Sequence, residues 1–143
     1  MRLYVLESAR YYVVPTPQKR AIGRPEDAAR LMAAIAKREQ REVFVVFLLN
    51  SKNCVRRAHV ISIGTLNASI IHPREVFVPA VRHSAAAILI AHNHPSGVAT
   101  PSREDIAITK RIQKAGEILG IDLLDHIIIG GESHVSLKEL GVI

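Results

Sequence analysis

The stretch Val-Phe-Val-Val-Phe-Leu-Leu at residues 43–49 constrains the fold more than any other part of the sequence. Every residue in it is apolar, and several are β-branched. An uninterrupted run of this kind is typical of a central strand that is covered on both faces. The run therefore predicts a sheet with other elements packed on each side of it.

Other segments supply helices and further strands for this sheet. Pro25 and Pro73 each begin a helix, at a position where the missing N–H of proline costs nothing. A third helix is expected from Ser102 to about Leu119, because Gly120 then ends it. Further strands are expected at 54–63, 86–91, 121–130 and 133–136. The order of elements predicts an α/β fold, a single-domain mixed sheet flanked by helices.

The length and charge of the chain limit the number of domains and the kind of partner that we expect. With 143 residues, the sequence is long enough for one ordinary domain and too short for two. We divide it into an N-terminal arm or edge strand at 1–24 and a main domain at 25–143. Basic residues outnumber acidic ones by 19 to 13, and the net charge of +6 favours an acidic partner or nucleic acid.

The single cysteine, Cys54, excludes an intrachain disulfide and a cysteine-based zinc cluster, and it agrees with a cytoplasmic location. We expect its side chain to be a small buried hydrophobic group. The first residues contain no long apolar run, so we expect neither a signal peptide nor a membrane span.

His92-Asn93-His94 follows the strand expected at 86–91 and precedes a proline and a glycine that end any further strand. If residue 92 is still extended, His92 and His94 point to the same side, because strand side chains alternate. Two imidazoles on one side form two corners of a metal site. Zinc takes nitrogen, sulfur or carboxylate ligands in a tetrahedron, so a carboxylate is expected to complete the protein ligands.

Asp105 is the third expected ligand. It lies one turn before the apolar stripe of the third helix, and Ser102 lies one turn before Asp105, so both are expected to face the core. A carboxylate placed inward is costly unless a positive charge pairs with it, and a metal ion supplies that charge. The same Ser-x-x-Asp spacing is also that of a capping box, which needs no metal. The stripe consists of Ile108, Ile112, Ala115 and Leu119.

Two histidines and one aspartate leave a fourth position for water, which is characteristic of catalytic zinc sites. The metal lowers the pKa of that water, and a base has to carry its proton to a leaving group. Glu42, directly before the 43–49 strand, is the candidate base. The alternative is that Glu42 is an exposed residue of the charged run 37–42, because sequence alone does not bring residue 42 beside residue 92.

His92-x-His94, seven intervening residues and Ser102-x-x-Asp105 match the JAMM motif of the JAB/MPN+ metalloproteases in residue type and spacing. The wider stretch AHNHPSGVATPSREDIAITKRI, with GTLNASIIHPREV before it and LLDHIIIGG after it, resembles the RadC branch of that superfamily. The resemblance runs from about Pro25 to the C-terminus and implies a JAB/MPN, cytidine-deaminase-like fold. RadC proteins resemble a fusion of this domain to an N-terminal helix-hairpin-helix unit, which we expect to be lacking here because only residues 1–24 precede the first helix.

The resemblance implies one Zn²⁺ per chain, bound by the two histidines and Asp105, with Glu42 as acid and base. It further implies that Ser102 binds the water or the developing oxyanion. We therefore expect a metallopeptidase-type hydrolase that cleaves an amide, peptide or isopeptide bond in a peptide or protein. The alternative is a metal-dependent nuclease or DNA-associated repair factor. Nucleic-acid binding and a homo-oligomeric state stay open, and no membrane partner is expected.

Other polar residues have weaker patterns. Asp125 and His126 are candidates for orienting a ligand imidazole, although we expect one of the two to face solvent because strand neighbours alternate. Thr65, Asn67 and Ser69 are expected to satisfy loop backbone groups rather than to line a substrate groove. The remaining histidines are expected to be structural or at the surface: His59, His72, His83 and His134.

Overall fold

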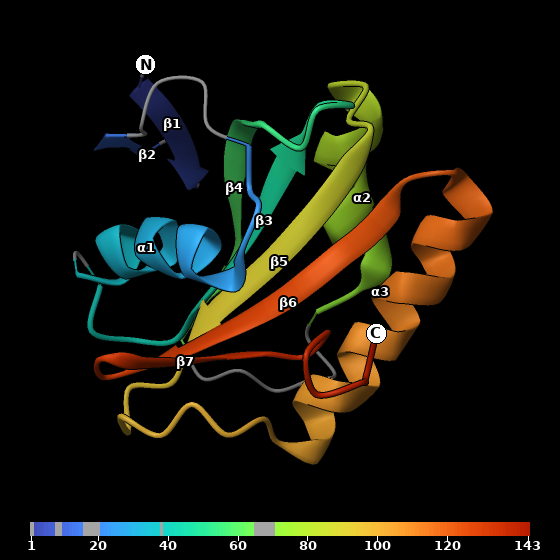
Figure 1. Ribbon diagram of the computed structural model, residues 1–143. Helices are drawn as coiled ribbons and strands as arrows, with labels where there is room; N and C mark the ends of the chain where they lie inside the picture. The colour runs from blue at the N-terminus through green and yellow to red at the C-terminus, as the bar shows by residue number, and fades with distance from the viewer. Residues whose placement is uncertain (1, 8–9, 16–20, 38, 65–70) are drawn as a thin grey trace.

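The computed structural model in Figure 1 describes residues 2–7, 10–15, 21–37, 39–64 and 71–143. Thr65, Asn67 and Ser69 lie outside these ranges. The strands are β1 (Arg2–Glu7), β2 (Arg10–Pro15), β3 (Val43–Leu49), β4 (Val55–Ile63), β5 (Ala87–Asn93), β6 (Asp122–Gly130) and β7 (Ser133–Ser136). The helices are α1 (Pro25–Ala36), α2 (Pro73–Arg82) and α3 (Arg103–Leu119). None of these helices is long and apolar enough to cross a membrane.

All described strands join one mixed sheet in the order β2-β1-β4-β3-β5-β6-β7. β3 runs antiparallel to β4 and to β5, whereas β5 and β6 are parallel and are connected through α3. The β1–β2 hairpin lies within the predicted N-terminal arm and pairs with the outer edge of β4. The predicted single domain with a mixed sheet and flanking helices is therefore confirmed.

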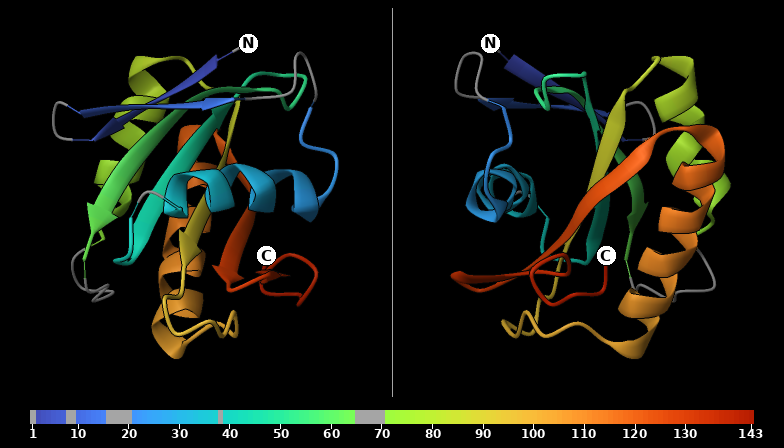
Figure 2. Two further views of the ribbon diagram at one scale, coloured as in Figure 1. Left: turned by 90° about the vertical axis from the view of Figure 1, so that its left-hand side faces the viewer. Right: turned by 45° about the vertical axis from the view of Figure 1, so that its right-hand side comes forward.

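β3 is buried along its whole length, as its apolar sequence predicts. Its side chains alternate between two hydrophobic cores. Val45 and Phe47 pack in the core beneath α1, whereas Phe44 and Val46 pack in the core beneath α2 and α3. Figure 2 shows this three-layer arrangement, with α1 on one face of the sheet and α2 and α3 on the other. The continuous apolar run is explained by this burial on both faces.

Three predictions about burial away from β6 were wrong. Ser102 was expected to face the core, but it is exposed because it lies just outside the first turn of α3 as its N-cap residue. Leu119 is 49% exposed, because the buried face of α3 passes through Ile112 and Gly116 and the last turn of the helix points outward. Gly120 nevertheless ends α3 in the left-handed conformation, as expected. Cys54 is only partly buried, because it lies in the turn before β4, where its sulfur is 3.8 Å from the carbonyl oxygen of Lys52.

Candidate metal centre

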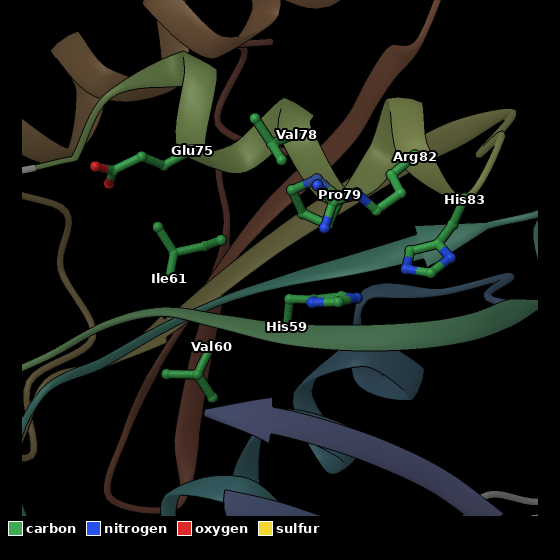
Figure 3. A pocket seen from close by; sticks show the side chains of 8 residues that line it. All are labelled: His59, Val60, Ile61, Glu75, Val78, Pro79, Arg82 and His83. Carbon is green, nitrogen blue, oxygen red and sulfur yellow. The ribbon is translucent and has the colours of Figure 1, made fainter. Parts of the chain in front are cut away.

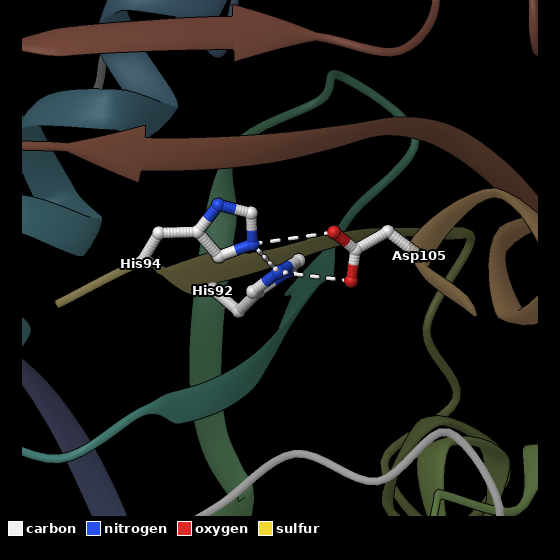
Figure 4. Close-up of side chains that lie close together, drawn as sticks. All are labelled: His92, His94 and Asp105. Carbon is white, nitrogen blue, oxygen red and sulfur yellow. Dashed lines mark hydrogen bonds and ion pairs between the residues drawn. The ribbon is translucent and has the colours of Figure 1, made fainter. Parts of the chain in front are cut away.

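Three predicted ligands converge at the end of β5. Nε2 of His92 lies 3.0 Å from Nε2 of His94 and 3.2 Å from Oδ1 of Asp105. Nε2 of His94 lies 3.2 Å from Oδ2 of the same carboxylate. Figure 4 shows both rings and the carboxylate directed toward one point. Within the described residues, these three are the group of histidine and acidic side chains able to hold a metal ion.

The strand β5 places the two histidines on one side. It continues to Asn93, two residues beyond its expected end, because His92 is paired with Phe44 of β3 and Asn93 with Ile129 of β6. The backbone N–H of His94 extends this pairing by donating to the carbonyl of Ile129 at 2.7 Å. The backbone is therefore extended through residue 92, which is the condition under which the two side chains face the same way.

The first turn of α3 supplies the carboxylate. Ser102 is the N-cap residue of this helix, and its Oγ accepts the backbone N–H of Asp105 at 3.0 Å. Oδ2 of Asp105 accepts the backbone N–H of Ser102 at 2.8 Å, which completes a capping box. The two interpretations of the Ser-x-x-Asp spacing are thus compatible, because one carboxylate caps the helix and also faces both imidazoles.

The arrangement of donor atoms fits a small cation. Nδ1 of His94 lies 2.8 Å from the carbonyl oxygen of Val98. A carbonyl only accepts, so Nδ1 of His94 carries a proton, and in the neutral ring Nε2 then has a free electron pair. Ligand atoms about 2.0–2.1 Å from a tetrahedral zinc ion lie about 3.3 Å from one another. The separations of 3.0 and 3.2 Å are close to this value.

Asp105 is ionised in this environment. Burial by itself raises the pKa of its carboxyl. When the ring of His92 is protonated, its hydrogen bond and charge, together with the hydrogen bonds from Ser102, outweigh burial and hold the pKa of Asp105 well below its usual range. The side chain is only 13% exposed, so the negative charge faces the two imidazoles rather than bulk water. A bound cation would be attracted to such a site.

His126 of β6 extends the site behind His92. Its Nε2 lies 2.8 Å from Nδ1 of His92, and its Nδ1 lies 2.6 Å from Oγ1 of Thr109 in α3. His126 is completely buried, and this burial, followed by the charge of His92, holds its pKa well below the usual range. The prediction did not include Thr109, although a polar residue on the buried face of a helix one turn after Asp105 was a signal for such a contact.

The expectation that Asp125 or His126 faces solvent was wrong, because both are buried. Asp125 contacts the segment around β7 instead. Its carboxylate accepts hydrogen bonds from Oγ of Ser136 at 2.6 Å and from the backbone N–H of Lys138 at 3.1 Å. Both sides of β6 are covered at this point, so strand alternation separates the two side chains without exposing either.

Glu42 lies immediately before β3 and is half-buried. Asn93 holds the peptide groups on either side of it: Oδ1 of Asn93 accepts the N–H of Val43 at 2.7 Å, and its Nδ2 donates to the carbonyl of Arg41 at 3.1 Å. Because Phe44 pairs with His92, continuing the same register by two residues brings position 42 opposite position 94. The catalytic role of Glu42 stays a prediction.

Comparison with known proteins now identifies the family. A model of the RadC-like JAB domain matches residues 22–142. The chain belongs to the RadC-like JAB domain family. The expected resemblance is therefore confirmed, and the matched range includes the convergent histidines and aspartate.

Relatives of this RadC-like JAB domain are found in bacteria and archaea. A UPF0758 protein of Desulforamulus reducens is 52% identical over 134 residues, which cover 94% of this chain and 59% of the relative. A UPF0758 protein of Bacillus cereus is 55% identical over 121 residues, covering 85% and 54%. One of Methanosarcina mazei is 48% identical over 125 residues, covering 87% and 55%. The chain thus spans little more than half the length of these curated relatives.

Proposed function

We propose that the chain is a zinc-dependent hydrolase that cleaves an amide bond, either peptide or isopeptide, in a peptide or protein. The observation that supports this most directly is the convergence of His92, His94 and Asp105 with separations suited to tetrahedral zinc. These residues supply three protein ligands, which is the number found in catalytic rather than structural zinc sites. The membership of the RadC-like JAB family agrees with this proposal.

The three ligands would hold the ion, and each has a defined support. His94 is oriented by the carbonyl of Val98, and Asp105 is oriented by the backbone N–H of Ser102. When bound, zinc supplies positive charge that lowers the pKa of a water molecule and polarises a substrate carbonyl. The low exposure of His92, 1%, limits competition from bulk water on that side of the site.

Glu42 takes the proton from the attacking water and passes it to the leaving amine in this proposal. The support is the register between β3 and β5 and the two hydrogen bonds by which Asn93 fixes the backbone around Glu42. Ser102 donates a hydrogen bond from its hydroxyl to the developing oxyanion and keeps its proton. Its Oγ uses an electron pair to cap α3, and accepting that bond leaves the O–H able to donate.

The experiment that tests the proposal is elemental analysis combined with hydrolysis. The purified chain is expected to hold about one zinc ion, whereas His92→Ala and Asp105→Ala should hold much less. Cleavage of a mixed fluorogenic peptide library should be lost on treatment with a chelator and restored by zinc. A chain with zinc in the site and no cleavage of any amide probe would contradict the proposed activity.

A second candidate, a metal-dependent nuclease or DNA-associated factor, is favoured by the net charge of +6 and by Arg82 in a hollow between β4 and α2. This hollow has a volume of about 450 Å³ and includes His59, Arg82 and His83. Figure 3 shows the rings of His59 and His83 near one another at one end and Glu75 at the other. Measuring oligonucleotide binding and cleavage beside the peptide library separates the two candidates. A nuclease or DNA-associated factor should bind the oligonucleotide with an affinity that falls steeply as the salt concentration rises.

A further inference from the structure

We propose that Thr109 and His126 are positioning residues that keep the proton of His92 on Nδ1 and so leave its Nε2 free to bind a cation. The hydrogen bonds that join Thr109, His126 and His92 are called the histidine relay below. The proposal rests on the proposed function only for the identity of the cation. The hydrogen-bond directions follow from the described side chains themselves.

The direction of the relay begins at a backbone carbonyl. Oγ1 of Thr109 lies 2.6 Å from the carbonyl oxygen of Asp105. This oxygen has no proton, so the threonine hydroxyl must donate its only proton to it. Oγ1 is also 2.6 Å from Nδ1 of His126. Since its proton is already used, Oγ1 accepts here, and Nδ1 of His126 carries the proton.

The same reasoning passes through His126 to the metal ligand. A neutral imidazole with its proton on Nδ1 has a free electron pair on Nε2. Nε2 of His126 therefore accepts from Nδ1 of His92, which lies 2.8 Å away. His126 is 0% exposed and His92 is 1% exposed, so water has little access to replace these hydrogen bonds. In the neutral ring, Nε2 of His92 is consequently unprotonated where it faces His94 and Asp105.

The relay also connects two ligands that come from different elements. It starts at the backbone of Asp105 in α3, crosses to His126 in β6 and ends at His92 in β5. The ring of His92 then faces the carboxylate of the same Asp105 at 3.2 Å. A shift of α3 along the sheet would therefore break the relay and separate the two ligands. Thr109 can make this connection because it lies one turn after Asp105 and reaches back to its carbonyl.

The benefit of the relay concerns the proton that a metal ion would have to displace. A histidine side chain free in water favours the form with the proton on Nε2. In that form the proton sits on Nε2, the atom of His92 that faces His94 and Asp105. Fixing the proton on Nδ1 removes this competition and holds the ring plane before any ion arrives.

The first test uses the metal-free full chain and needs neither substrate nor ion. Long-range ¹H–¹⁵N correlation spectra distinguish protonated from unprotonated ring nitrogens. We expect the proton on Nδ1 in both His92 and His126. In Thr109→Val, which keeps the shape but removes the hydroxyl, we expect His92 to show a mixture of forms. Thr109→Ser should restore the wild-type pattern.

The second test measures zinc affinity by competition with a chromophoric chelator. We expect Thr109→Val to bind zinc about 10–100-fold more weakly, and Thr109→Ser to bind like wild type. Ser136→Ala is the matched control, because it removes another buried hydroxyl, the one bonded to Asp125, without touching the relay. It should change neither the His92 proton nor the affinity.

Three results would overturn the inference. One is a neutral His92 ring with its proton on Nε2 and none on Nδ1 in the metal-free wild type, a measurement that stands even if Thr109→Val fails to fold. Another is a folded Thr109→Val with unchanged proton position and zinc affinity. The last is a loss of zinc affinity in Ser136→Ala equal to that in Thr109→Val, which would indicate that removing any buried hydroxyl near β6 weakens the site. A chain that passes both tests but cleaves no amide bond would contradict the proposed function and leave the relay intact.

Discussion

Oδ2 of Asp105 lies 3.2 Å from Nε2 of His94 while it also accepts the backbone N–H of Ser102. The start of α3 and the candidate metal centre are therefore built from the same carboxylate. This shared use has two consequences. Orienting the helix orients the ligand, and any substitution at Ser102 has to be separated into an effect on the helix and an effect on catalysis.

Two substitutions at Ser102 make that separation. Ser102→Ala should lower the free energy of unfolding by about 1 kcal/mol, whereas Ser102→Gly should lower it by only a few tenths, because glycine is tolerated at the N-cap. Loss of an oxyanion donor should reduce turnover about 10²–10³-fold in both. Denaturant unfolding and peptide hydrolysis measure the two effects. Normal turnover in Ser102→Gly would restrict the serine to capping.

Glu42→Gln tests the proposed base. The amide keeps the size of the side chain but cannot take up a proton, so turnover should fall about 10²–10⁴-fold while zinc content is unchanged. Glu39→Gln is a suitable control, because Glu39 lies in the same charged run and pairs with Arg41 at the surface. Full activity in Glu42→Gln would exclude Glu42 as the base.

Asn93→Asp tests how Glu42 is held. An aspartate can still accept the N–H of Val43, but it loses the donor that now bonds the carbonyl of Arg41. We expect reduced turnover with retained zinc, and a loss of unfolding free energy of about 1–3 kcal/mol for the unsatisfied group. Asn50→Asp is the control at the other end of β3, where the asparagine side chain uses only its acceptor oxygen in contacts with the described residues. Equal losses of turnover in the two variants would contradict a specific role for Asn93.

The parts of the structure that depend on local pattern could be predicted from the sequence. The burial of β3 follows from its unbroken apolar run, and the capping of α3 follows from the Ser102–Asp105 spacing. Contacts between distant elements were harder to predict. The hydrogen bond from Thr109 to His126 joins a helix to a strand, and no local period encodes which residues will meet there.

His126 illustrates the limit most clearly. Alternation along a strand correctly separates it from Asp125, but it does not say whether both sides of the strand are covered. In β6 both sides are covered, so the pair is buried. The pairing of β3 with β5 is likewise needed before residue 42 can be related to residue 94.

Arg57 provides a prediction away from the metal centre. The rings of His59 and His83 have centroids 5.6 Å apart. Burial lowers the pKa of His59, and the charges of His83 and Arg57 lower it further. Burial also lowers the pKa of His83, followed by the charges of Arg57 and Arg82. Arg57→Gln should therefore raise the pKa of both histidines in an NMR titration. Arg56→Gln removes a neighbouring exposed arginine and should shift them less.

The same variant should change how stability depends on pH. The pKa of such a histidine is lower in the folded chain than its ordinary value of 6.5 in the unfolded chain. The unfolded chain therefore binds more protons as the pH falls below 6.5, and the free energy of unfolding decreases until the pH reaches the lower, folded-state pKa. Arg57→Gln should raise the folded-state pKa and so shorten the pH interval between the folded-state and unfolded-state pKa values. Denaturant unfolding above and below pH 6.5 should therefore show a smaller loss of stability on acidification in Arg57→Gln than in wild type. An unchanged or steeper loss would show that Arg57 does not control the titration of this pair.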